Sequence, residues 1–154
     1  MLKKYLIFTL LILSLTGFKN LYSSEKDLLK VNWSFKSFTG KFDRSSLQRG
    51  YQVYKEVCAS CHSMRLLSYR NLGEAGGPEF TVNEVKNIAA SFEVTDGPDD
   101  QGEMFTRAGR PSDRFVSPYP NIQAATAANG GAYPPDMSVL VKSRKGGANY
   151  IYSV

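Results

Sequence analysis

Apolar residues recur every three to four positions in the stretch from about residue 44 to residue 58, which is the period of an amphipathic helix. The repeating positions are Leu47, Tyr51, Tyr54 and Cys58. Asp43 stands where an N-cap is expected, and Phe42 before it has the spacing of a hydrophobic staple with Leu47. The pattern predicts a helix that buries one face.

A second helix is predicted after Phe80. Residues 81–84 read Thr-Val-Asn-Glu, which is a capping box, and Phe80 and Val85 have staple spacing. Its inner face is predicted to consist of Val85, Ile88, Ala89 and Phe92. Shorter helices are expected at residues 122–128 and 136–144, because a glycine follows the end of each at Gly130 and Gly146.

Long irregular segments separate these helices. Residues 25–42 are expected to be extended or irregular, and residues 93–120 are rich in Gly, Pro and Asp. A loop of that length within a compact domain is usually functional or wrapped around something. Residues 149–154 begin another apolar run, in which the sequence ends. The expected fold class is therefore mostly α, with long irregular loops.

The first 24 residues have the three parts of a secretory signal peptide. Lys3 and Lys4 are followed by an apolar stretch over residues 5–18 and by the small residues Ser23 and Ser24. The stretch is shorter than the ~20 residues that cross a bilayer, although an uncleaved membrane anchor remains the alternative. In both cases residues 25–154, the expected functional domain, would be exported.

The net charge of +5 depends on this leader, because three of the lysines lie in it: Lys3, Lys4 and Lys19. Cleavage near Ser24 would leave a charge of about +2, which does not indicate a nucleic-acid partner.

The chemistry of the chain is concentrated at residues 58–62, which read Cys-Ala-Ser-Cys-His. This is the attachment pattern of c-type haem. Two cysteines three positions apart on a helical turn lie on one side, separated by ~4.5 Å of axial rise, so both thiols can reach one porphyrin. His62 follows directly and is the only histidine in the chain, so it is the predicted proximal iron ligand.

Two other readings of this motif are weaker. A thioredoxin-like redox pair would need a strand-to-helix setting in a βαβ fold, whereas Cys58 and Cys61 stand at the end of a helix. A zinc site would need a further Cys or His ligand, and the sequence contains no other.

The sixth iron ligand stays open at this point. Met64 is two residues from His62 and is too close along the chain to pass around the ring. Met104 and Met137 can reach in principle, although methionine is more often core filler than a ligand. An open sixth position would instead suggest a haem enzyme that binds small ligands.

The chain resembles the cytochrome c1 family, the haem subunit of the cytochrome bc1 complex, over nearly all of its exported length. The matching stretches are residues 33–35, 40–43, 47–50, 58–63, 97–105, 118–121, 129–136 and 144–147, together with Tyr150. The family's axial methionine and membrane helix come after the Arg-Lys-Gly-Gly segment at residues 144–147. The resemblance therefore implies a chain truncated at its C-terminus, without the membrane anchor.

The resemblance implies a c-type cytochrome domain that carries one covalent haem c and passes single electrons. Its donor would be the Rieske iron–sulfur protein, its acceptor a cytochrome c, and its neighbour in the membrane complex cytochrome b. The implied location is the periplasmic face of the bacterial inner membrane or the equivalent intermembrane side. By itself such a chain is an electron carrier, within a quinol–cytochrome c oxidoreductase complex.

The resemblance also implies roles for single residues. Cys58 and Cys61 would bind haem covalently with His62 on the iron, and further haem contacts would come from Asn129, Pro134, Pro135, Arg144 and Tyr150. Arg144 and Tyr150 are implied to meet the haem propionates. For Arg144 the chemistry agrees, since a guanidinium binds a carboxylate bidentately, but a helix-end charge that stabilises the helix dipole is the alternative.

A run of acidic residues lies in the long segment, at Glu93, Asp96, Asp99, Asp100 and Glu103. Near a haem edge such a run can attract a basic cytochrome c, whereas the alternative is a solvated turn. Two other functions are compatible with the haem motif: an independent periplasmic electron shuttle and a haem enzyme with an open iron.

Overall fold

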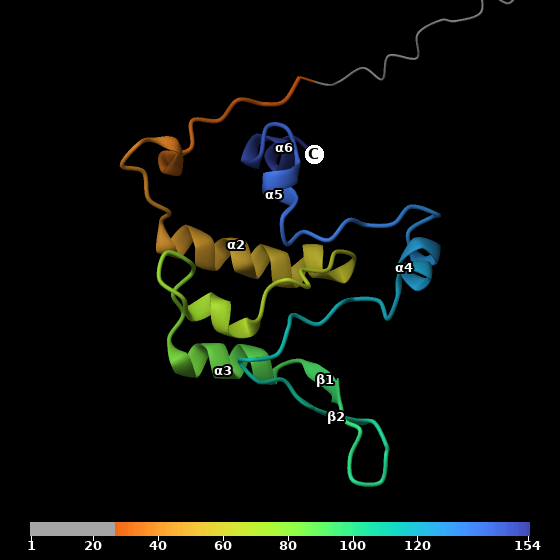
Figure 1. The fold of residues 1–154 in the computed structure, drawn as a ribbon. Helices are drawn as coiled ribbons and strands as arrows, with labels where there is room; N and C mark the ends of the chain where they lie inside the picture. Colours follow the sequence, from red (N-terminus) through yellow and green to blue (C-terminus); the bar gives the residue numbers. More distant parts are fainter. Residues whose placement is uncertain (1–26) are drawn as a thin grey trace, which may run out of the picture.

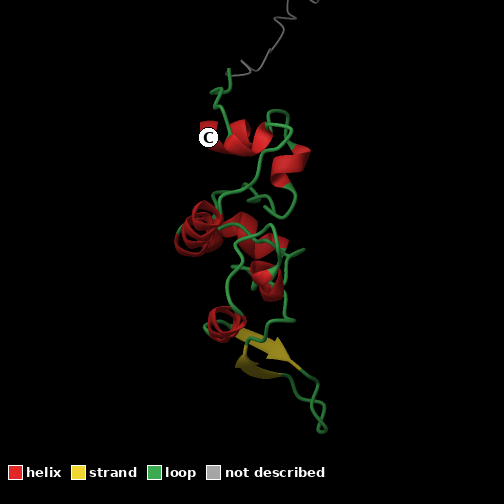
Figure 2. Ribbon diagram, turned by 90° about the vertical axis from the view of Figure 1, so that its left-hand side faces the viewer, coloured by secondary structure: helices red, strands yellow, loops and turns green. Residues whose placement is uncertain are grey.

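A computed structural model of the chain describes residues 27–154, so the predicted signal peptide at residues 1–24 lies outside the described residues. In chain order the 3₁₀ helices (η), α-helices and strands are η1 (Ser34–Lys36), α2 (Arg44–Glu56), η2 (Cys58–Ser60), η3 (Tyr69–Gly73), α3 (Val82–Ala90), β1 (Glu93–Asp96), β2 (Phe105–Ala108), α4 (Ile122–Ala128), α5 (Leu140–Ser143) and α6 (Ala148–Ser153). Short helices and loops follow one another along the molecule, and the strands lie at one end (Figure 2). The expectation of a mostly helical chain with long loops is thus confirmed.

Helices α2 and α3 begin where their caps predict. The Asp43 carboxylate accepts a hydrogen bond from the Ser46 backbone N–H at 2.7 Å, and α2 starts at the next residue. Thr81 Oγ1 accepts from the Glu84 N–H at 3.3 Å, while the Glu84 carboxylate accepts from the Thr81 N–H at 2.7 Å. Both predicted N-termini are confirmed, because each cap satisfies N–H groups that have no partner within the helix.

Removal of the Thr81 cap gives the first prediction. The substitution Thr81→Ala leaves the Glu84 N–H without its acceptor, so the free energy of unfolding should fall by about 1 kcal/mol. Urea unfolding followed by circular dichroism measures this loss. Thr81→Ser keeps the hydroxyl and should unfold close to the unsubstituted chain, and an equal loss in both variants would contradict the capping role.

The core is aromatic and lies between α2, η3 and α3. Its buried members are Tyr54, Tyr69, Leu72, Val85, Ala89 and Phe115. Tyr69 stacks on Phe115 with ring centroids 4.8 Å apart and on Phe92 at 5.2 Å. Figure 1 shows α2 in the middle of the molecule, with η3 and α3 on one side and α5 and α6 on the other. The central position of α2 places residues 58–62, which follow it, near the middle of the fold.

The sequence did not predict the hairpin formed by β1 and β2. These strands pair antiparallel, with Glu93 opposite Ala108 and Asp96 opposite Phe105. Polar contacts stabilise the hairpin where buried apolar residues would usually do so. The Arg107 guanidinium pairs with Asp96, and the Asp99 carboxylate accepts from the backbone N–H of Gln101 and Glu103 across the turn. Alternating apolar residues, the usual signal of a strand, are therefore missing.

The helix expected at residues 136–144 is shorter in the structure. Only α5 (Leu140–Ser143) is helical there, and Asp136 lies before it. The Asp136 side chain crosses to another segment, where it accepts hydrogen bonds from Ser63 and Arg65. The other carboxylate oxygen of Asp136 accepts from the Ser138 N–H at 2.9 Å, but the chain forms only a turn at residues 138–139, and the helix begins at Leu140.

The segment before α2 packs against the last helix. Trp33 Nε1 donates to Asn149 Oδ1 at 2.7 Å, and the Trp33 ring meets Tyr152 edge-on at 5.8 Å. The 3₁₀ helix η1 is the only regular element among residues 27–42. These contacts fold α6 back onto the described beginning of the chain, at the top of Figure 1.

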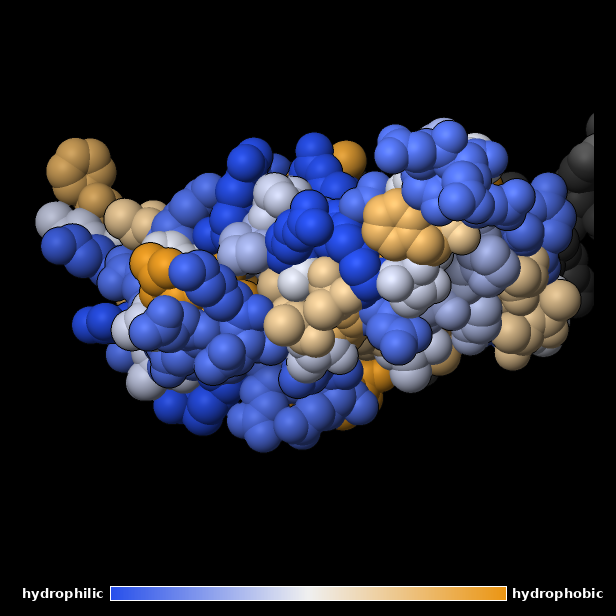
Figure 3. Space-filling view, turned by 90° about the horizontal axis from the view of Figure 1, so that it is seen from below, coloured by the Kyte–Doolittle hydropathy of each residue, from blue (hydrophilic) through white to orange (hydrophobic). Residues whose placement is uncertain are grey.

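The outer surface is mainly polar at the hairpin end. Figure 3 shows the molecule from below relative to Figure 1; most residues on this face are hydrophilic, and the apolar ones form separate spots. Within residues 27–154, no helix has both the length and the apolar character needed to cross a membrane.

Candidate functional site

The cysteine motif forms a tight helical turn directly after α2. The α-helix is followed by the 3₁₀ helix η2. The Cys58 carbonyl accepts hydrogen bonds from the N–H of Cys61 at 3.1 Å and of His62 at 2.8 Å. Both cysteines are half-buried and neither forms a disulfide. The turn keeps the two thiols and the imidazole within a single short stretch of ordered backbone.

The His62 ring is held by a distant backbone group. His62 Nδ1 lies 2.8 Å from the Pro135 carbonyl oxygen. A carbonyl can only accept, so Nδ1 carries the proton and donates it, which leaves the lone pair on Nε2. An imidazole oriented in this way is prepared to bind a metal through Nε2.

Tyr54 supports the same turn from inside the core. Burial raises the pKa of Tyr54 to about 12, so its phenol is protonated at neutral pH and donates to the His62 carbonyl at 3.3 Å. Helix α2 carries Tyr54 on its buried face, where the period of the sequence predicted it. Helix α2 therefore leads into the cysteine motif and also holds the backbone of His62 in place through Tyr54.

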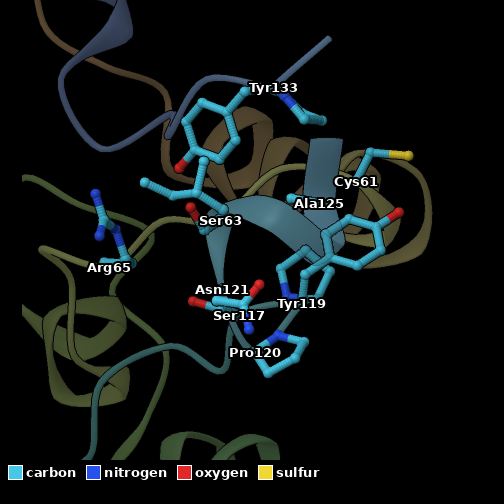
Figure 4. A pocket seen from close by; sticks show the side chains of 12 residues that line it. Cys61, Ser63, Arg65, Ser117, Tyr119, Pro120, Asn121, Ala125 and Tyr133 are labelled. Carbon is cyan, nitrogen blue, oxygen red and sulfur yellow. The ribbon is translucent and has the colours of Figure 1, made fainter. Parts of the chain in front are cut away.

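A cavity of about 140 Å³ opens beside the motif. Its lining includes Cys61 and Ser63 from the turn, Tyr119 from the segment before α4, Ala125 from α4, and Tyr133 (Figure 4). Figure 4 shows Tyr119 and Tyr133 on either side of the cavity and the Cys61 sulfur at its edge. Whole ligand sites commonly measure ~300–1,000 Å³, so this hollow can enclose one edge of a haem.

The residues present fit a covalently held haem. Two free thiols stand on one turn, and the next side chain offers Nε2 to a metal. Six of the twelve residues that line the adjacent hollow are proline, tyrosine or alanine, which suit a flat apolar ring, while Ser63, Arg65, Ser117 and Asn121 add polar groups. Among the described residues no group of three or more His, Cys, Asp and Glu side chains could hold a bare metal ion, so the zinc alternative gains no support.

Three further residues that were predicted to contact haem lie near this motif or its cavity. Pro134 lines the cavity, and Pro135 provides the carbonyl that binds the His62 ring. Asn129 ends α4, where its side-chain amide donates to the Ala125 carbonyl at 2.7 Å and to the Tyr119 hydroxyl at 3.3 Å. Asn129 thereby links two residues of the cavity lining.

Arg144 and Tyr150 lie elsewhere. The Arg144 guanidinium carbon is 5.6 Å from the centroid of the Tyr150 ring, a cation–π distance. The two line a different hollow, together with Leu28 and Lys145, beside α5 and α6. The structure thus brings Arg144 and Tyr150 to each other, outside the cavity that contains Cys61.

The three methionines among residues 27–154 differ in their surroundings. Met64 and Met137 are partly buried against the aromatic core, and the Met137 N–H donates to the Ser63 carbonyl at 2.8 Å. Met104 is exposed in the connection between β1 and β2. The structure places none of these residues in the lining of the cavity.

The acidic run occupies the hairpin, and part of it is paired. Arg107 forms a bidentate pair with Asp113, at 2.7 and 3.0 Å, and also binds Asp96. The Arg107 guanidinium lowers the pKa of Asp113 to about 2, and it lowers the pKa of Asp96 as well. Asp96, which belongs to the run, and Asp113, which follows it, therefore share one arginine that lies between them in the sequence.

This pairing predicts a loss of stability in acid. A carboxyl group with a lowered pKa stabilises the fold above its ordinary pKa of ~3.9, and that contribution disappears as the pH falls through the folded value. For Asp113 the loss should occur between about pH 4 and pH 2, since the unfolded chain takes up the proton first. Urea midpoints measured at several pH values test this.

The matched variant is Asp113→Asn. It should be less stable at neutral pH and should show a smaller decline between pH 4 and pH 2, because one titrating group has been removed. A decline equal to that of the unsubstituted chain would show that Asp113 does not contribute to acid sensitivity.

Sequence reasoning missed Asp136 and Ser63 at this site. Asp136 Oδ2 accepts from Ser63 Oγ at 2.7 Å and from the Arg65 N–H at 2.9 Å, and Oδ1 accepts from the Ser138 N–H at 2.9 Å. Burial alone would raise the pKa of Asp136, but these hydrogen bonds outweigh it and hold the pKa well below its ordinary value. The available signal was that Ser63 and Asp136 lie in the stretches 58–63 and 129–136, which match the family, but no local pattern assigned either residue a role.

Comparison with known proteins relates the chain to one family. Residues 33–154 match the model of the Cytochrome C1 family. Cytochrome b/c1 of Bradyrhizobium diazoefficiens is 56% identical over 118 residues, which cover 77% of this chain and 17% of that protein. Cytochrome c1 of Rhodospirillum rubrum is 46% identical over 152 residues, 99% of this chain and 55% of that protein.

A plant relative carries a name that states its cofactor. "Cytochrome c1-2, heme protein, mitochondrial" of Solanum tuberosum is 54% identical over 122 residues, 79% of this chain and 46% of that protein. The chain thus spans about half the length, or less, of these curated relatives.

Proposed function

This chain belongs to the cytochrome C1 family, and from that premise we propose that it is the haem-bearing, electron-transferring part of a ubiquinol–cytochrome c reductase (bc1) complex. It would accept single electrons from the Rieske iron–sulfur protein and pass them to a cytochrome c. Cytochrome b would be its neighbour in that complex. One observation carries the proposal: His62, beside the cysteine pair, has its Nδ1 bound at 2.8 Å by a backbone carbonyl.

The proposed roles follow from the geometry of the turn. Cys58 and Cys61 would hold one haem c through thioethers, and His62 Nε2 would bind its iron. The haem, when bound, supplies an iron that cycles between its ferric and ferrous states. The Pro135 carbonyl keeps the imidazole in one orientation, so the ligand need not reorganise between those states.

We further propose that the cavity beside Cys61 receives one edge of the haem. Pro134 would contact the ring directly, and Asn129 would hold the cavity residues Tyr119 and Ala125 in place. Arg144 and Tyr150, which contact each other beside a separate hollow, would meet the propionates, because a guanidinium binds a carboxylate bidentately.

The domain organisation is also a proposal. Residues 1–24 would direct export, and residues 25–154 would form the c-type cytochrome domain on the periplasmic face of the membrane or its mitochondrial equivalent. The small net charge of that domain favours protein partners over nucleic acid.

Stopped-flow spectroscopy with purified partners tests the function. The haem-loaded chain should be reduced by a reduced Rieske protein and reoxidised by ferric cytochrome c, and it should copurify with cytochrome b. Electron exchange without copurification would favour an independent shuttle. Rapid carbon monoxide binding together with peroxidase turnover and no exchange would favour a haem enzyme.

A further inference from the structure

We propose that Asp136 is a positioning residue for His62, which holds in place the loop whose Pro135 carbonyl binds the imidazole. This inference rests on the proposed function, because it concerns the orientation of the iron ligand. Asp136 would touch neither haem nor iron, and would act through the backbone of its neighbour.

Two segments far apart in the sequence are joined here residue by residue. His62 binds Pro135, Ser63 receives the Met137 N–H at 2.8 Å, and the Leu66 N–H donates to Ser138 Oγ at 3.0 Å. The Asp136 carboxylate lies within this set of contacts. It accepts from the Ser63 hydroxyl and the Arg65 N–H on one side and from the Ser138 N–H on the other.

The carbonyl that binds His62 belongs to the peptide unit between Pro135 and Asp136. That unit is planar, so fixing the Asp136 backbone also fixes the direction of the Pro135 oxygen. On the other side, the ring of Pro135 restricts its own φ. Asp136 is therefore the residue whose side chain most directly sets where this acceptor points.

The site requires a carboxylate and not merely a polar side chain of this size. Every group that faces Asp136 from the 63–66 and 138 segments is a donor: the Ser63 hydroxyl, the N–H groups of Arg65 and Ser138, and the Arg65 guanidinium at 3.3 Å. An asparagine would place its own NH₂ against one of these donors. The Asp136 side chain is only 16% exposed, so water would compensate poorly for the lost acceptor.

The expected consequence is electronic as well as structural. A hydrogen bond from Nδ1 to a carbonyl makes the imidazole a stronger donor to iron and stabilises the ferric state. A misdirected Pro135 carbonyl would weaken that effect. The reduction potential should then rise, and the Fe–His stretching band of the ferrous protein should move to lower wavenumber.

The experiment compares three variants of the full chain matured in a haem-attaching host. Asp136→Asn keeps the volume of the Asp136 side chain. Ser63→Ala removes only the hydrogen bond from Ser63 to Asp136, so it disturbs the fold less than Asp136→Asn does. Asp113→Asn is the matched control, because Asp113 is also paired and is 15% exposed but contacts Arg107. Redox titration gives the potential, and resonance Raman after photolysis of the carbon monoxide adduct gives the Fe–His band.

We expect the potential to rise and the band to fall in Asp136→Asn, with smaller shifts of the same sign in Ser63→Ala. Asp113→Asn should lose stability without either shift. Covalent haem in all proteins, with the potential and band of Asp136→Asn unmoved, would overturn this inference alone. An unsubstituted chain that attaches no haem would overturn the proposed function and this inference with it.

Discussion

A chain that carries Cys58→Ala together with Cys61→Ala should contain no covalently bound haem after maturation in a haem-attaching host. These are the only two cysteines in the sequence, so no other thiol can form a thioether. Each single variant should retain haem through one remaining bond. The loss in the double variant is expected to be complete, because a haem bound without thioethers is removed by denaturation.

Haem staining of denaturing gels measures this result. Ser60→Ala is the matched control, since Ser60 lies between the two cysteines, and its loss removes only contacts with Val57 and the Cys61 sulfur. It should stain like the unsubstituted chain. Covalent haem in the double alanine variant would show that the attachment lies elsewhere.

The second large effect is expected at Phe115. The substitution Phe115→Ala should lower the free energy of unfolding by about 3–5 kcal/mol, the usual cost of removing a buried aromatic ring. Phe115 is 6% exposed and stacks on Tyr69, and its ring also approaches Tyr54 at 6.0 Å. Such a cost is a large part of the stability of a small domain.

Urea unfolding of the haem-loaded protein gives the midpoint and slope for this comparison. Phe38→Ala serves as the control, because the Phe38 side chain is fully exposed. It should change stability little. Equal losses at the two positions would contradict the placement of the core between α2, η3 and α3.

Local signals explain how much of the fold the sequence predicted. A capping box or an N-cap acts within four residues, and so Asp43 and Thr81 correctly mark the starts of α2 and α3. The hairpin of β1 and β2 depends on Arg107 reaching two carboxylates, Asp96 and Asp113. Contacts of that kind have no periodic signature, and residues 93–120 were therefore expected to be irregular throughout.

In the candidate site, too, local features could be predicted from the sequence and contacts between distant residues could not. Cys58, Cys61 and His62 could be identified because their chemistry depends on adjacent positions. The contact between His62 and Pro135 joins residues 73 positions apart, as does that between Ser63 and Asp136. Only the folded chain reveals that Asp136 binds the segment directly after the cysteine motif.

Hydrogen bonding at the histidine also connects the fold with the proposed chemistry. Helix α2 provides Tyr54, which donates to the His62 carbonyl, while the loop after α4 provides the Pro135 acceptor for the ring. The backbone and the ring of His62 are thus held by separate parts of the molecule. Such support favours one fixed ligand geometry, as a carrier of single electrons requires.

The intact mass of the denatured, unsubstituted protein tests the central claim most directly. After maturation in a host that attaches c-type haem, the polypeptide that remains once the leader is cleaved should be heavier than its own residues by one haem, and it should keep its colour in denaturant. A colourless polypeptide with the mass of the bare chain would contradict the attachment of haem at Cys58 and Cys61.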